Sequence, residues 1–329
     1  MSGKIRIGIC GYGNLGRGVE SEIAKNPDME LAAVFTRRAP AGSLRIKADV
    51  PVAHAGEAAA MWKGRIDVMI LCGGSKSDLP AQGPEFAKSF NTVDSFDTHA
   101  KIPAYFEAVD KAAKSGNNIS VVSIGWDPGL FSLLKLYAGS IIPNGKTYTF
   151  WGRGVSQGHS EAIRGVPGVV DAIQYTIPDA VAMERVRNGE NPDLTAHERH
   201  KRECFVVVAD GAGKENIENE IKTMPDYFKD YETTVHFISM EELKANHGKM
   251  THGGNAIHFG KTGEGNGQTL EFSLKLDSNP EFTSSVLLAY ARAAYRLSAR
   301  GESGARTIFD IPPVLLSPSV PEELIKTLL

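Results

Sequence analysis

A glycine-rich turn between an apolar run and an amphipathic segment constrains the fold more than any other feature of the chain. Residues 8–18 read GICGYGNLGRG, in which Gly11, Gly13 and Gly16 keep the spacing G-x-G-x-x-G. An apolar run precedes this turn, apolar residues recur at every fourth position from 15 to 23, and residues 30–35 form a second apolar run. A strand, turn, helix and strand within about 30 residues are typical of a dinucleotide-binding unit.

The three glycines have different expected roles. The first allows the tight turn, the second lets a pyrophosphate approach the backbone, and the third lets the helix pack closely on the strand. The N–H groups and the dipole at the helix N-terminus favour bound phosphate. A turn that needs glycine only for its backbone conformation is the alternative. The expected cofactor contacts in this turn are Gly11, Tyr12, Gly13, Asn14, Leu15 and Gly16.

The end of the second apolar run indicates which dinucleotide binds. An NAD enzyme carries an acid there, about 20 residues after the glycines, to bind the ribose hydroxyls. This chain has Thr36, Arg37 and Arg38 at that place. Two guanidinium groups can pair with a 2′-phosphate, whereas a solvated surface pair is the alternative. The pattern therefore favours NADP(H).

The remaining pattern predicts two domains. Apolar runs at 66–74, 91–97 and 117–129 alternate with helical segments, which is typical of a parallel sheet covered on both faces. Beyond residue 130 the strands become longer and alternate, as at 146–160, 201–210, 231–239 and 268–277. We predict an α/β protein with a Rossmann-type doubly wound parallel sheet and a second α+β domain for substrate and dimerisation. The first domain covers 1–127, completed by 284–329 packing back, and the second covers 128–283.

Composition excludes several classes of partner. The 36 basic and 39 acidic residues give a net charge of −3, so neither nucleic acid nor a membrane surface is an expected partner. The start of the chain enters a strand pattern at once, and no apolar run is long enough to span a bilayer, so we expect a cytoplasmic protein. The three cysteines are expected to be buried thiols, and the spacing of His247, His252 and His258 does not favour a metal site.

Several longer motifs point to one family. The segments GYGNLGR, FTRRA, VDSFDTH, SIGWDPG, FWGRGVSQGHS, TMPDYF and LKLDSNPEFT together resemble the meso-diaminopimelate dehydrogenases, and the resemblance runs almost end to end. It implies an NADP-dependent homodimer of bacterial lysine biosynthesis. The implied reaction is the oxidative deamination of the D-centre of meso-2,6-diaminopimelate to L-2-amino-6-oxopimelate and ammonia.

The resemblance also implies the site. Asp97 and Asp127 follow predicted parallel strands, where open α/β sheets build their sites, and would bind the reacting ammonium as the catalytic acids. Without the family, a helix cap or a turn former is the alternative for either aspartate. The implied substrate contacts are Trp126, Trp151, Gln157, Gly158, Ser160, Thr176, Arg202, His252 and Asn279, of which Arg202, Thr176 and His252 would share the distal carboxylate. Further cofactor contacts are Cys72, Gly73, Gly74, Ser75, Ser95, Phe96, Gly125 and Pro128.

Some points stay open. No lysine is placed as the proton carrier of L-amino-acid dehydrogenases, so a carboxylate or an ordered water has this role. Arg153 departs from at least one relative, which has proline there, and adjoins the expected substrate wall. The alternatives are another two-domain NADP-dependent oxidoreductase, such as a sugar or semialdehyde dehydrogenase, and a non-catalytic NADP-binding regulator.

Overall fold

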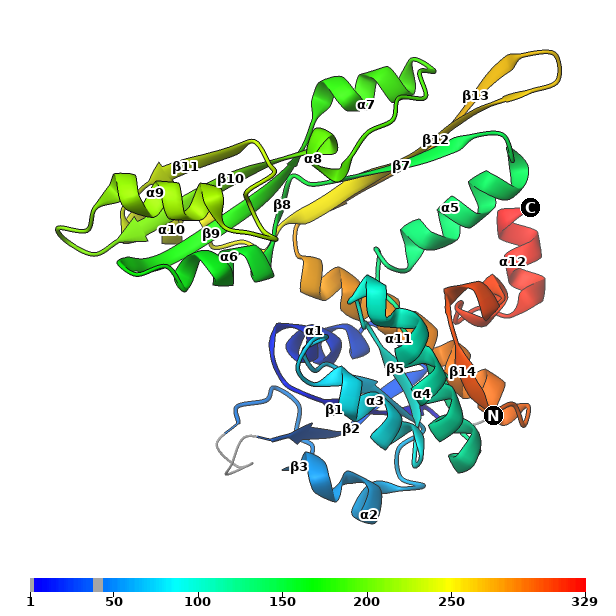
Figure 1. Cartoon of the computed structure of the whole chain (residues 1–329). Helices are drawn as coiled ribbons and strands as arrows, with labels where there is room; N and C mark the ends of the chain where they lie inside the picture. The colour runs from blue at the N-terminus through cyan, green and yellow to red at the C-terminus, as the bar shows by residue number, and fades with distance from the viewer. Residues whose placement is uncertain (1–2, 38–43) are drawn as a thin grey trace. The chain divides into compact units, whose positions relative to one another are not determined.

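The computed structural model describes residues 3–37 and 44–329 of the chain. Contacts divide it into two compact units, which are described separately. Unit 1 contains Met1–Leu133 and Pro280–Leu329, and unit 2 contains Leu134–Asn279. Figure 1 labels most of the helices and strands of both units.

Unit 1 is built on a parallel sheet whose order among the described strands is β14-β6-β5-β4-β1-β2-β3. Read from β3 to β6, this is the Rossmann order 3-2-1-4-5-6, and every neighbouring pair is parallel. The predicted doubly wound sheet is confirmed. Its strands are β1 (Ile5–Cys10), β2 (Met29–Thr36), β3 (Val52–His54), β4 (Val68–Leu71), β5 (Asn91–Asp94), β6 (Ile119–Val121) and β14 (Gly304–Arg306).

Helices cover both faces of this sheet, because its strands carry apolar side chains on each (Figure 1). Ile7 and Ile9 of β1 pack with Leu287 and Ala291 of α11, and Met69 on the other face packs in the same cluster as residues of α3 and α4. The helices of unit 1 are α1 (Asn14–Ile23), α2 (Ala58–Trp62), α3 (Leu79–Ala87), α4 (Ile102–Gly116) and α12 (Pro321–Leu328), with α11 (Asn279–Ala299) beginning at the boundary and α5 (Leu130–Ile141) crossing it.

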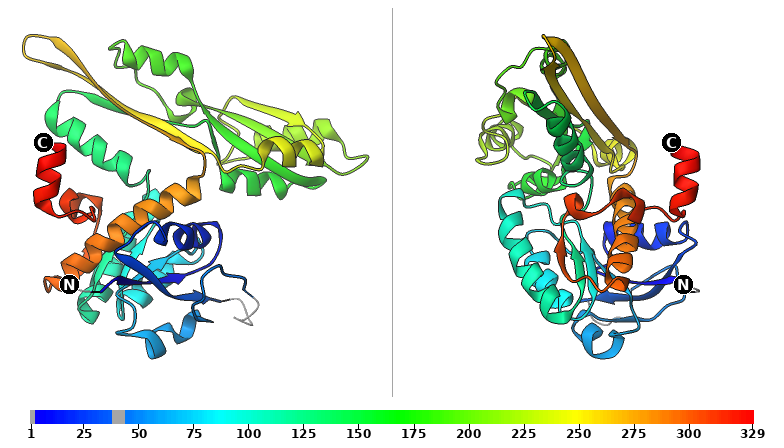
Figure 2. Two further views of the ribbon diagram at one scale, coloured as in Figure 1. Left: turned by 180° about the vertical axis from the view of Figure 1, so that it is seen from behind. Right: turned by 90° about the vertical axis from the view of Figure 1, so that its right-hand side faces the viewer.

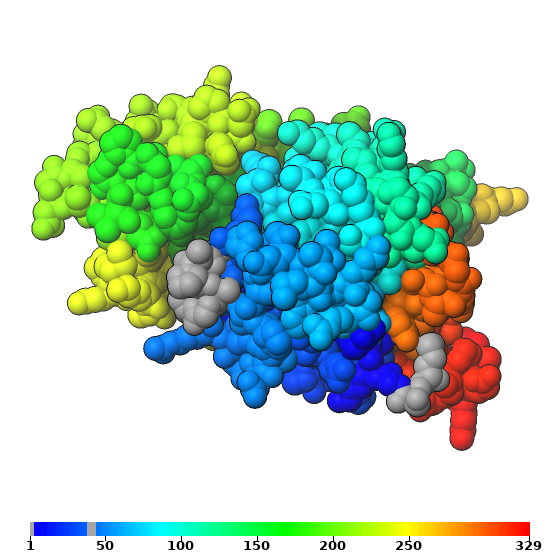
Figure 3. All heavy atoms as spheres, turned by 90° about the horizontal axis from the view of Figure 1, so that it is seen from below, coloured from blue at the N-terminus to red at the C-terminus, as the bar shows by residue number. Residues whose placement is uncertain are grey.

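The C-terminal segment is an integral part of unit 1. Strand β14 adds to the sheet beside β6, and the buried Arg292 of α11 forms an ion pair with Asp28 at 2.6 Å. Arg292 also donates to Asn26 Oδ1 and to the Leu316 carbonyl, so its donors have partners despite burial. Figure 3 shows the C-terminal residues, in orange and red, beside the dark blue N-terminal residues.

Unit 2 contains two smaller sheets, of order β11-β10-β9-β8 and β13-β12-β7 among the described strands. The first is mixed, since β10 pairs parallel with β11 and antiparallel with β9, and the second is antiparallel. Figure 2 shows the long β12–β13 pair from two sides. The strands are β7 (Lys146–Trp151), β8 (Gly154–Val155), β9 (Val169–Pro178), β10 (His200–Val208), β11 (Thr233–Phe237), β12 (His252–Thr262) and β13 (Asn266–Leu276).

Five short helices of unit 2 are described: α6 (Gln157–Arg164), α7 (Ala180–Arg187), α8 (Ala196–Arg199), α9 (Lys214–Thr223) and α10 (Met240–His247). The prediction of one strand over 146–160 is wrong, because β7 ends at Trp151 and β8 (Gly154–Val155) belongs to the other sheet. Helix α6 then begins at Gln157, where Ser160 and Ile163, at i, i+3 spacing, bury on β9. Among the described residues, no helix combines the length and the apolar character needed to cross a bilayer.

Candidate active site

The glycine turn has the geometry that its spacing predicts. Gly11 has φ +96°, which L side chains rarely adopt, and a Cβ there would lie 3.1 Å from the Cys72 carbonyl carbon. A Cβ at Gly16 would lie 2.2 Å from the Gly11 carbonyl oxygen, so helix α1 packs directly on the turn. A Cβ at Gly13 would meet no atom within 4 Å, which leaves open space beside the backbone at the N-terminus of α1.

Tyr12 of this turn points into the protein. Its side chain is buried, and its hydroxyl donates to the Glu20 carboxylate of α1. Glu20 Oε1 also accepts the Lys47 and Ala48 N–H groups, each at 2.8 Å. Burial, followed by the hydrogen bond to Glu20, raises the pKa of the Tyr12 phenol to about 12. Tyr12 can therefore contact a dinucleotide only through its backbone.

At the end of β2, Thr36 is buried and Arg37 is exposed, while Arg38 lies outside the described residues. Arg37 Nη2 pairs with Asp78 Oδ1 at 2.6 Å, and Asp78 Oδ2 accepts the Gly74 N–H at 2.8 Å. Asp78 is distant from Arg37 in the sequence, and the loop before α3 brings the two side chains together.

The loops after β4 and β5 are joined by hydrogen bonds at the carboxyl edge of the sheet. Ser75 Oγ accepts the Asp97 N–H at 2.9 Å and lies 3.1 Å from the Thr98 hydroxyl. Asp97 is exposed, whereas Phe96 is buried and stacks on Tyr105 with ring centroids 4.2 Å apart. Two strand ends that carry predicted cofactor and catalytic residues thus lie side by side.

The loop after β6 carries Trp126 and Asp127. The Trp126 ring is buried and meets Phe131 edge-on, with centroids 5.4 Å apart, while Asp127 is half-buried. The carbonyls of Gly125 and Trp126 accept the first N–H groups of α5 at 3.1 and 2.8 Å. Pro128 follows Asp127 in this turn, and Gly129 has φ +133°, which favours glycine.

In unit 2, strands β9 and β10 place Thr176 directly opposite Arg202. The Arg202 guanidinium is buried, donates to Thr176 Oγ1 at 2.6 Å and lies 4.0 Å from the centre of the Tyr231 ring. Burial lowers the pKa of Arg202, and Tyr231 acts in the opposite direction. Among the described residues, Arg202 Nε has no hydrogen-bond partner. A buried guanidinium beside an aromatic ring suits a carboxylate ligand.

His252 and Trp151 lie on the strands next to this pair. Gly154 pairs with Thr176, and a Cβ at Gly154 would lie 2.4 Å from the His252 ring, so glycine is needed for that contact. Burial lowers the pKa of His252. His252 is the first residue of β12.

Trp151 is held by a buried histidine. The Trp151 ring stacks on His200 with centroids 4.9 Å apart, and the backbone N–H of Trp151 donates to His200 Nε2 at 2.8 Å. His200 Nδ1 lies 3.1 Å from the Ala196 carbonyl, so the neutral ring satisfies both partners with its proton on Nδ1. Burial lowers the pKa of His200 to about 4.

The remaining predicted substrate contacts differ in whether their side chains are exposed or bonded within the protein. Gln157 and Gly158 are exposed at the start of α6, and the Asn279 N–H donates to the Met250 carbonyl at 2.9 Å. The buried Ser160 hydroxyl donates to the Ser156 carbonyl and accepts the Gln174 N–H at 2.9 Å. The Ser160 side chain therefore holds α6 to β9.

Arg153, which was expected to adjoin the substrate wall, contacts side chains other than those of Arg202 and Thr176. Arg153 pairs with Glu203 and lies 4.5 Å from the centre of the Tyr175 ring. Successive strand residues face opposite sides of a sheet, and Tyr175 and Glu203 each neighbour Thr176 and Arg202 along their strands. Arg153 thus lies on the face opposite to Arg202.

The predicted site residues fall into two groups by unit. Unit 1 holds the glycine turn, Asp97 and Asp127, and unit 2 holds Arg202, Thr176 and His252. Sequence reasoning missed Asp78, His200 and Tyr231. Their contacts join residues far apart in the chain, and no local pattern marks them.

The cysteines and histidines do not add a further centre. All three cysteines are free thiols, of which Cys10 and Cys204 are buried as expected and Cys72 is partly exposed. Burial raises the pKa of each thiol, which disfavours the nucleophilic thiolate. Nowhere in residues 3–37 and 44–329 do three His, Cys, Asp or Glu side chains gather as they would around a metal ion.

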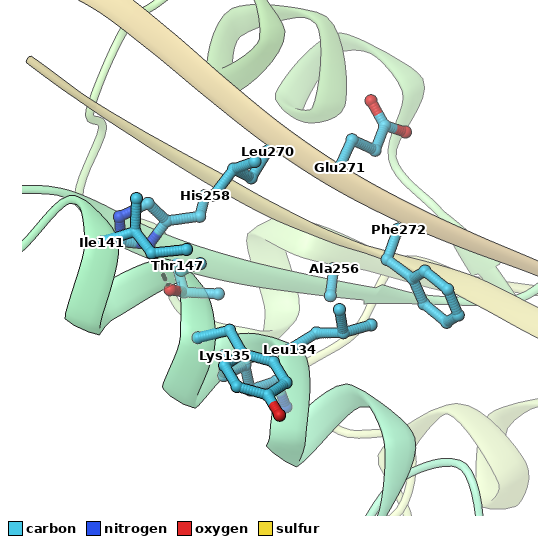
Figure 4. Close-up of a pocket in the computed structure, with 11 residues that line it drawn as sticks. Leu134, Lys135, Ile141, Thr147, Ala256, His258, Leu270, Glu271 and Phe272 are labelled. Carbon is cyan, nitrogen blue, oxygen red and sulfur yellow. Dashed lines mark hydrogen bonds between the residues drawn. The ribbon is translucent and has the colours of Figure 1, made fainter. Parts of the chain in front are cut away.

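A separate apolar cavity of about 320 Å³ lies in unit 2 between α5 and the β13-β12-β7 sheet. Figure 4 shows Leu134 and Ile141 of the helix opposite Ala256, Leu270 and Phe272 of the strands. His258 in its wall is committed to the fold, since Nδ1 lies 2.6 Å from the Thr147 hydroxyl and Nε2 lies 3.0 Å from the Ile142 carbonyl. Its lining contains none of the predicted site residues.

The depressed pKa of His200 predicts a pH-dependent stability. The unfolded chain binds a proton near pH 6.5 and the folded chain only near pH 4, so the free energy of unfolding falls as the pH drops between these values. We expect a loss of roughly 3 kcal/mol between pH 7 and pH 4, measured by urea unfolding. His200→Gln should remove this component, and the exposed His99→Gln is the control. An unchanged pH slope in His200→Gln would contradict the assignment.

Comparison with known proteins identifies the family. Residues 125–278 match the family model of the diaminopimelic acid dehydrogenase C-terminal domain. The meso-diaminopimelate D-dehydrogenase of Ureibacillus thermosphaericus is 62% identical over 326 residues, which cover 99% of each chain.

Solved structures agree with this result. A mutant meso-diaminopimelate dehydrogenase of Clostridium tetani E88 with DAP has a TM-score of 0.93 at 54% identity, covering 99% of this chain and 100% of its own. An engineered D-amino acid dehydrogenase bound to NADP+ has a TM-score of 0.86 at 44% identity, covering 98% and 99%. The resemblance seen in the sequence motifs is confirmed: the chain belongs to the meso-diaminopimelate D-dehydrogenase family.

Proposed function

We propose that the protein catalyses the reversible, NADP-dependent oxidative deamination of the D-centre of meso-2,6-diaminopimelate, giving L-2-amino-6-oxopimelate and ammonia. The observation that carries this proposal is membership of the family along 99% of the chain. The buried Arg202 and the acids at the strand ends of unit 1 supply the charges that such a substrate requires.

NADP(H) is the proposed cofactor. The glycine turn and the N-terminus of α1 offer backbone N–H groups and open space to a pyrophosphate. Arg37, held by Asp78, together with Arg38 would pair with the 2′-phosphate. We further assign Cys72, Gly73, Gly74, Ser75, Ser95, Phe96, Gly125 and Pro128, from the loops after β4, β5 and β6, as cofactor contacts.

The two ends of the substrate are recognised by different chemistry. Arg202, Thr176 and His252, with Asn279, would bind the carboxylate of the distal L-centre, because a guanidinium and neutral donors suit an anion. Asp97 and Asp127 would bind the reacting ammonium, directly or through water. Trp126 and Trp151 would form apolar walls, and Gln157 and Gly158 would contribute polar contacts.

The reaction then requires few groups from the protein. A bound nicotinamide would supply the hydride acceptor for the D-centre. The substrate ammonium would lose a proton and the D-centre carbon its hydride to give an iminium, a water would add to that carbon, and ammonia would leave to give the 2-oxo acid. Asp97 and Asp127 would orient and stabilise the cationic centre, and a carboxylate or an ordered water would carry the protons.

We propose different roles for the two units. Unit 1 would be the dinucleotide-binding domain, because it holds the glycine turn, and unit 2 the substrate-binding and dimerisation domain. We also propose that the enzyme acts in the cytoplasm as part of lysine biosynthesis. The three unpaired cysteines suit a reducing compartment.

A homodimer is proposed through the face that lines the cavity of Figure 4. Tyr137 and Ile141 of α5 and Leu270 of β13 are 46%, 66% and 42% exposed, and together they form an apolar surface. Strand β13 is also an edge strand of its sheet. A second copy that packs on this face would bury the exposed apolar side chains and cover the edge strand β13.

Stereochemistry tests the proposed function. NADPH formation should be far faster with the meso isomer than with LL- or DD-diaminopimelate, since a misplacement of about 1 Å costs on the order of 100-fold in rate. Arg202→Ala should lower kcat/KM for the meso isomer most and affect a simple D-amino acid less, whereas the exposed Arg185→Ala is the control. Equal rates with LL and meso isomers would contradict the D-centre assignment.

Cofactor choice tests the arginines. Replacing Arg37 and Arg38 together with Ala should weaken NADP binding by roughly 1.5–3 kcal/mol, about 10- to 150-fold, and leave NAD binding nearly unchanged. Titration calorimetry of both cofactors measures this, with the exposed Arg65→Ala as the control. If both cofactors lost affinity equally, the arginines would not read the 2′-phosphate.

The dimer face predicts the effect of a charge. Ile141→Asp should shift the sedimentation of the protein from dimer to monomer, because an ion would be buried without a partner. Met61→Asp replaces an apolar side chain in unit 1 that is 57% exposed, and should leave the dimer intact. A monomeric wild type, or a dimeric Ile141→Asp variant, would refute this interface.

A further inference from the structure

One buried carboxylate at the carboxyl edge of the unit 1 sheet has no role in the reaction proposed above. Asp94 is the last residue of β5 and is fully buried. Its Oδ1 accepts the Phe96 N–H at 3.0 Å and the Ser123 N–H at 3.1 Å, and its Oδ2 accepts the Tyr105 hydroxyl at 2.7 Å. One carboxylate group therefore joins two loops and helix α4.

The backbone of Asp94 strengthens the same connection. Its carbonyl accepts the Ile124 N–H at 2.8 Å, so Asp94 receives two successive N–H groups of the loop after β6. Ser123 has φ +59°, a left-handed conformation that is unfavourable for serine. The hydrogen bond from its N–H to Asp94 offsets that strain, because it is made in this conformation.

These two loops carry the proposed catalytic acids. Phe96 immediately precedes Asp97, and Ser123 begins the turn that leads to Trp126 and Asp127. We infer that Asp94 is a positioning residue, which fixes the loops of Asp97 and Asp127 relative to each other and to the nicotinamide end of the cofactor. The inference rests on the proposed function for the roles of those two aspartates.

The geometry also says which substitutions preserve the positioning. Asparagine keeps an oxygen that can accept from both Phe96 and Ser123, and its amide can donate to the Tyr105 oxygen. Alanine leaves both N–H groups buried without the side-chain acceptor, and serine is too short to reach both. Burial raises the pKa of Asp94, and the hydrogen bonds that it accepts act in the opposite direction.

The test compares Asp94→Ala, Asp94→Ser and Asp94→Asn. Adenosine 2′,5′-bisphosphate reports the adenosine end of the site and counts folded sites, NADP+ reports the whole site, and kcat with meso-diaminopimelate reports the chemistry. Thr92→Val is the matched control. It removes a buried 2.8 Å hydrogen bond between Thr92 of β5 and Ser120 of β6, and it leaves the loops after these strands unchanged.

We expect Asp94→Ala and Asp94→Ser to lower kcat per folded site by on the order of 10- to 100-fold, as for a displacement of up to about 1 Å. NADP+ affinity should fall, while affinity for adenosine 2′,5′-bisphosphate stays within about twofold. Asp94→Asn and Thr92→Val should retain kcat within about threefold, as expected for preserved acceptors and untouched loops.

Three results would overturn the inference. The first is normal kcat and NADP+ affinity in Asp94→Ala and Asp94→Ser, and the second is a loss of bisphosphate affinity in these variants as large as their loss of NADP+ affinity. The third is a kcat of Asp94→Asn as low as that of Asp94→Ala. A wild type that does not turn over meso-diaminopimelate would refute the proposed function separately, because the two binding measurements would still test Asp94.

Discussion

Gly16 lies so close to the Gly11 carbonyl that a Cβ at position 16 would be 2.2 Å from its oxygen. This close approach of α1 to the turn determines how unit 1 is built. Because the start of α1 rests directly on the turn after β1, the helix presents its N-terminal N–H groups at the carboxyl edge of the sheet. Gly11, at φ +96°, lies against the Cys72 backbone and thereby brings the loop after β4 to the same place. The hydrogen bond from Asp97 to Ser75 holds the loop after β5 at this edge, and the hydrogen bond from Ser123 to Asp94 holds the loop after β6 there.

In unit 2, alternate residues of the paired strands β9 and β10 face opposite sides of the sheet, so the proposed carboxylate-binding residues lie on one side and a structural ion pair lies on the other. Thr176 and Arg202 lie opposite each other on β9 and β10, and the guanidinium is buried on the Tyr231 ring. Neighbouring residues of the same strands face the other side, where Arg153 pairs with Glu203. The departure at Arg153 is therefore separated by the sheet from the proposed carboxylate site, so its effect on substrate binding would have to be indirect.

The sequence predicted those parts of the fold that local patterns encode. The glycine spacing and the apolar runs predicted the parallel sheet and the helical segments that alternate with its strands, such as α4 between β5 and β6. Helix α6 was missed because Gly158, His159 and Ser160 give little apolar periodicity. Strand β12 is rich in glycine and is a strand because β7 and β13 pair with it on both sides. Arg202 could be found from a motif, whereas Tyr231 and Asp78 act through contacts between distant residues.

The central claim is that the acids of unit 1 present one carbon of the substrate for oxidation while Arg202 holds the other end. Its most direct test uses meso-diaminopimelate deuterated only at the D-centre, with mass spectrometry of the reduced cofactor after turnover. The account predicts that the deuterium appears in the reduced NADP and that the 2-oxo product has lost it. Deuterium retained in the product, with unlabelled NADPH, would show that the L-centre is oxidised and would contradict the account.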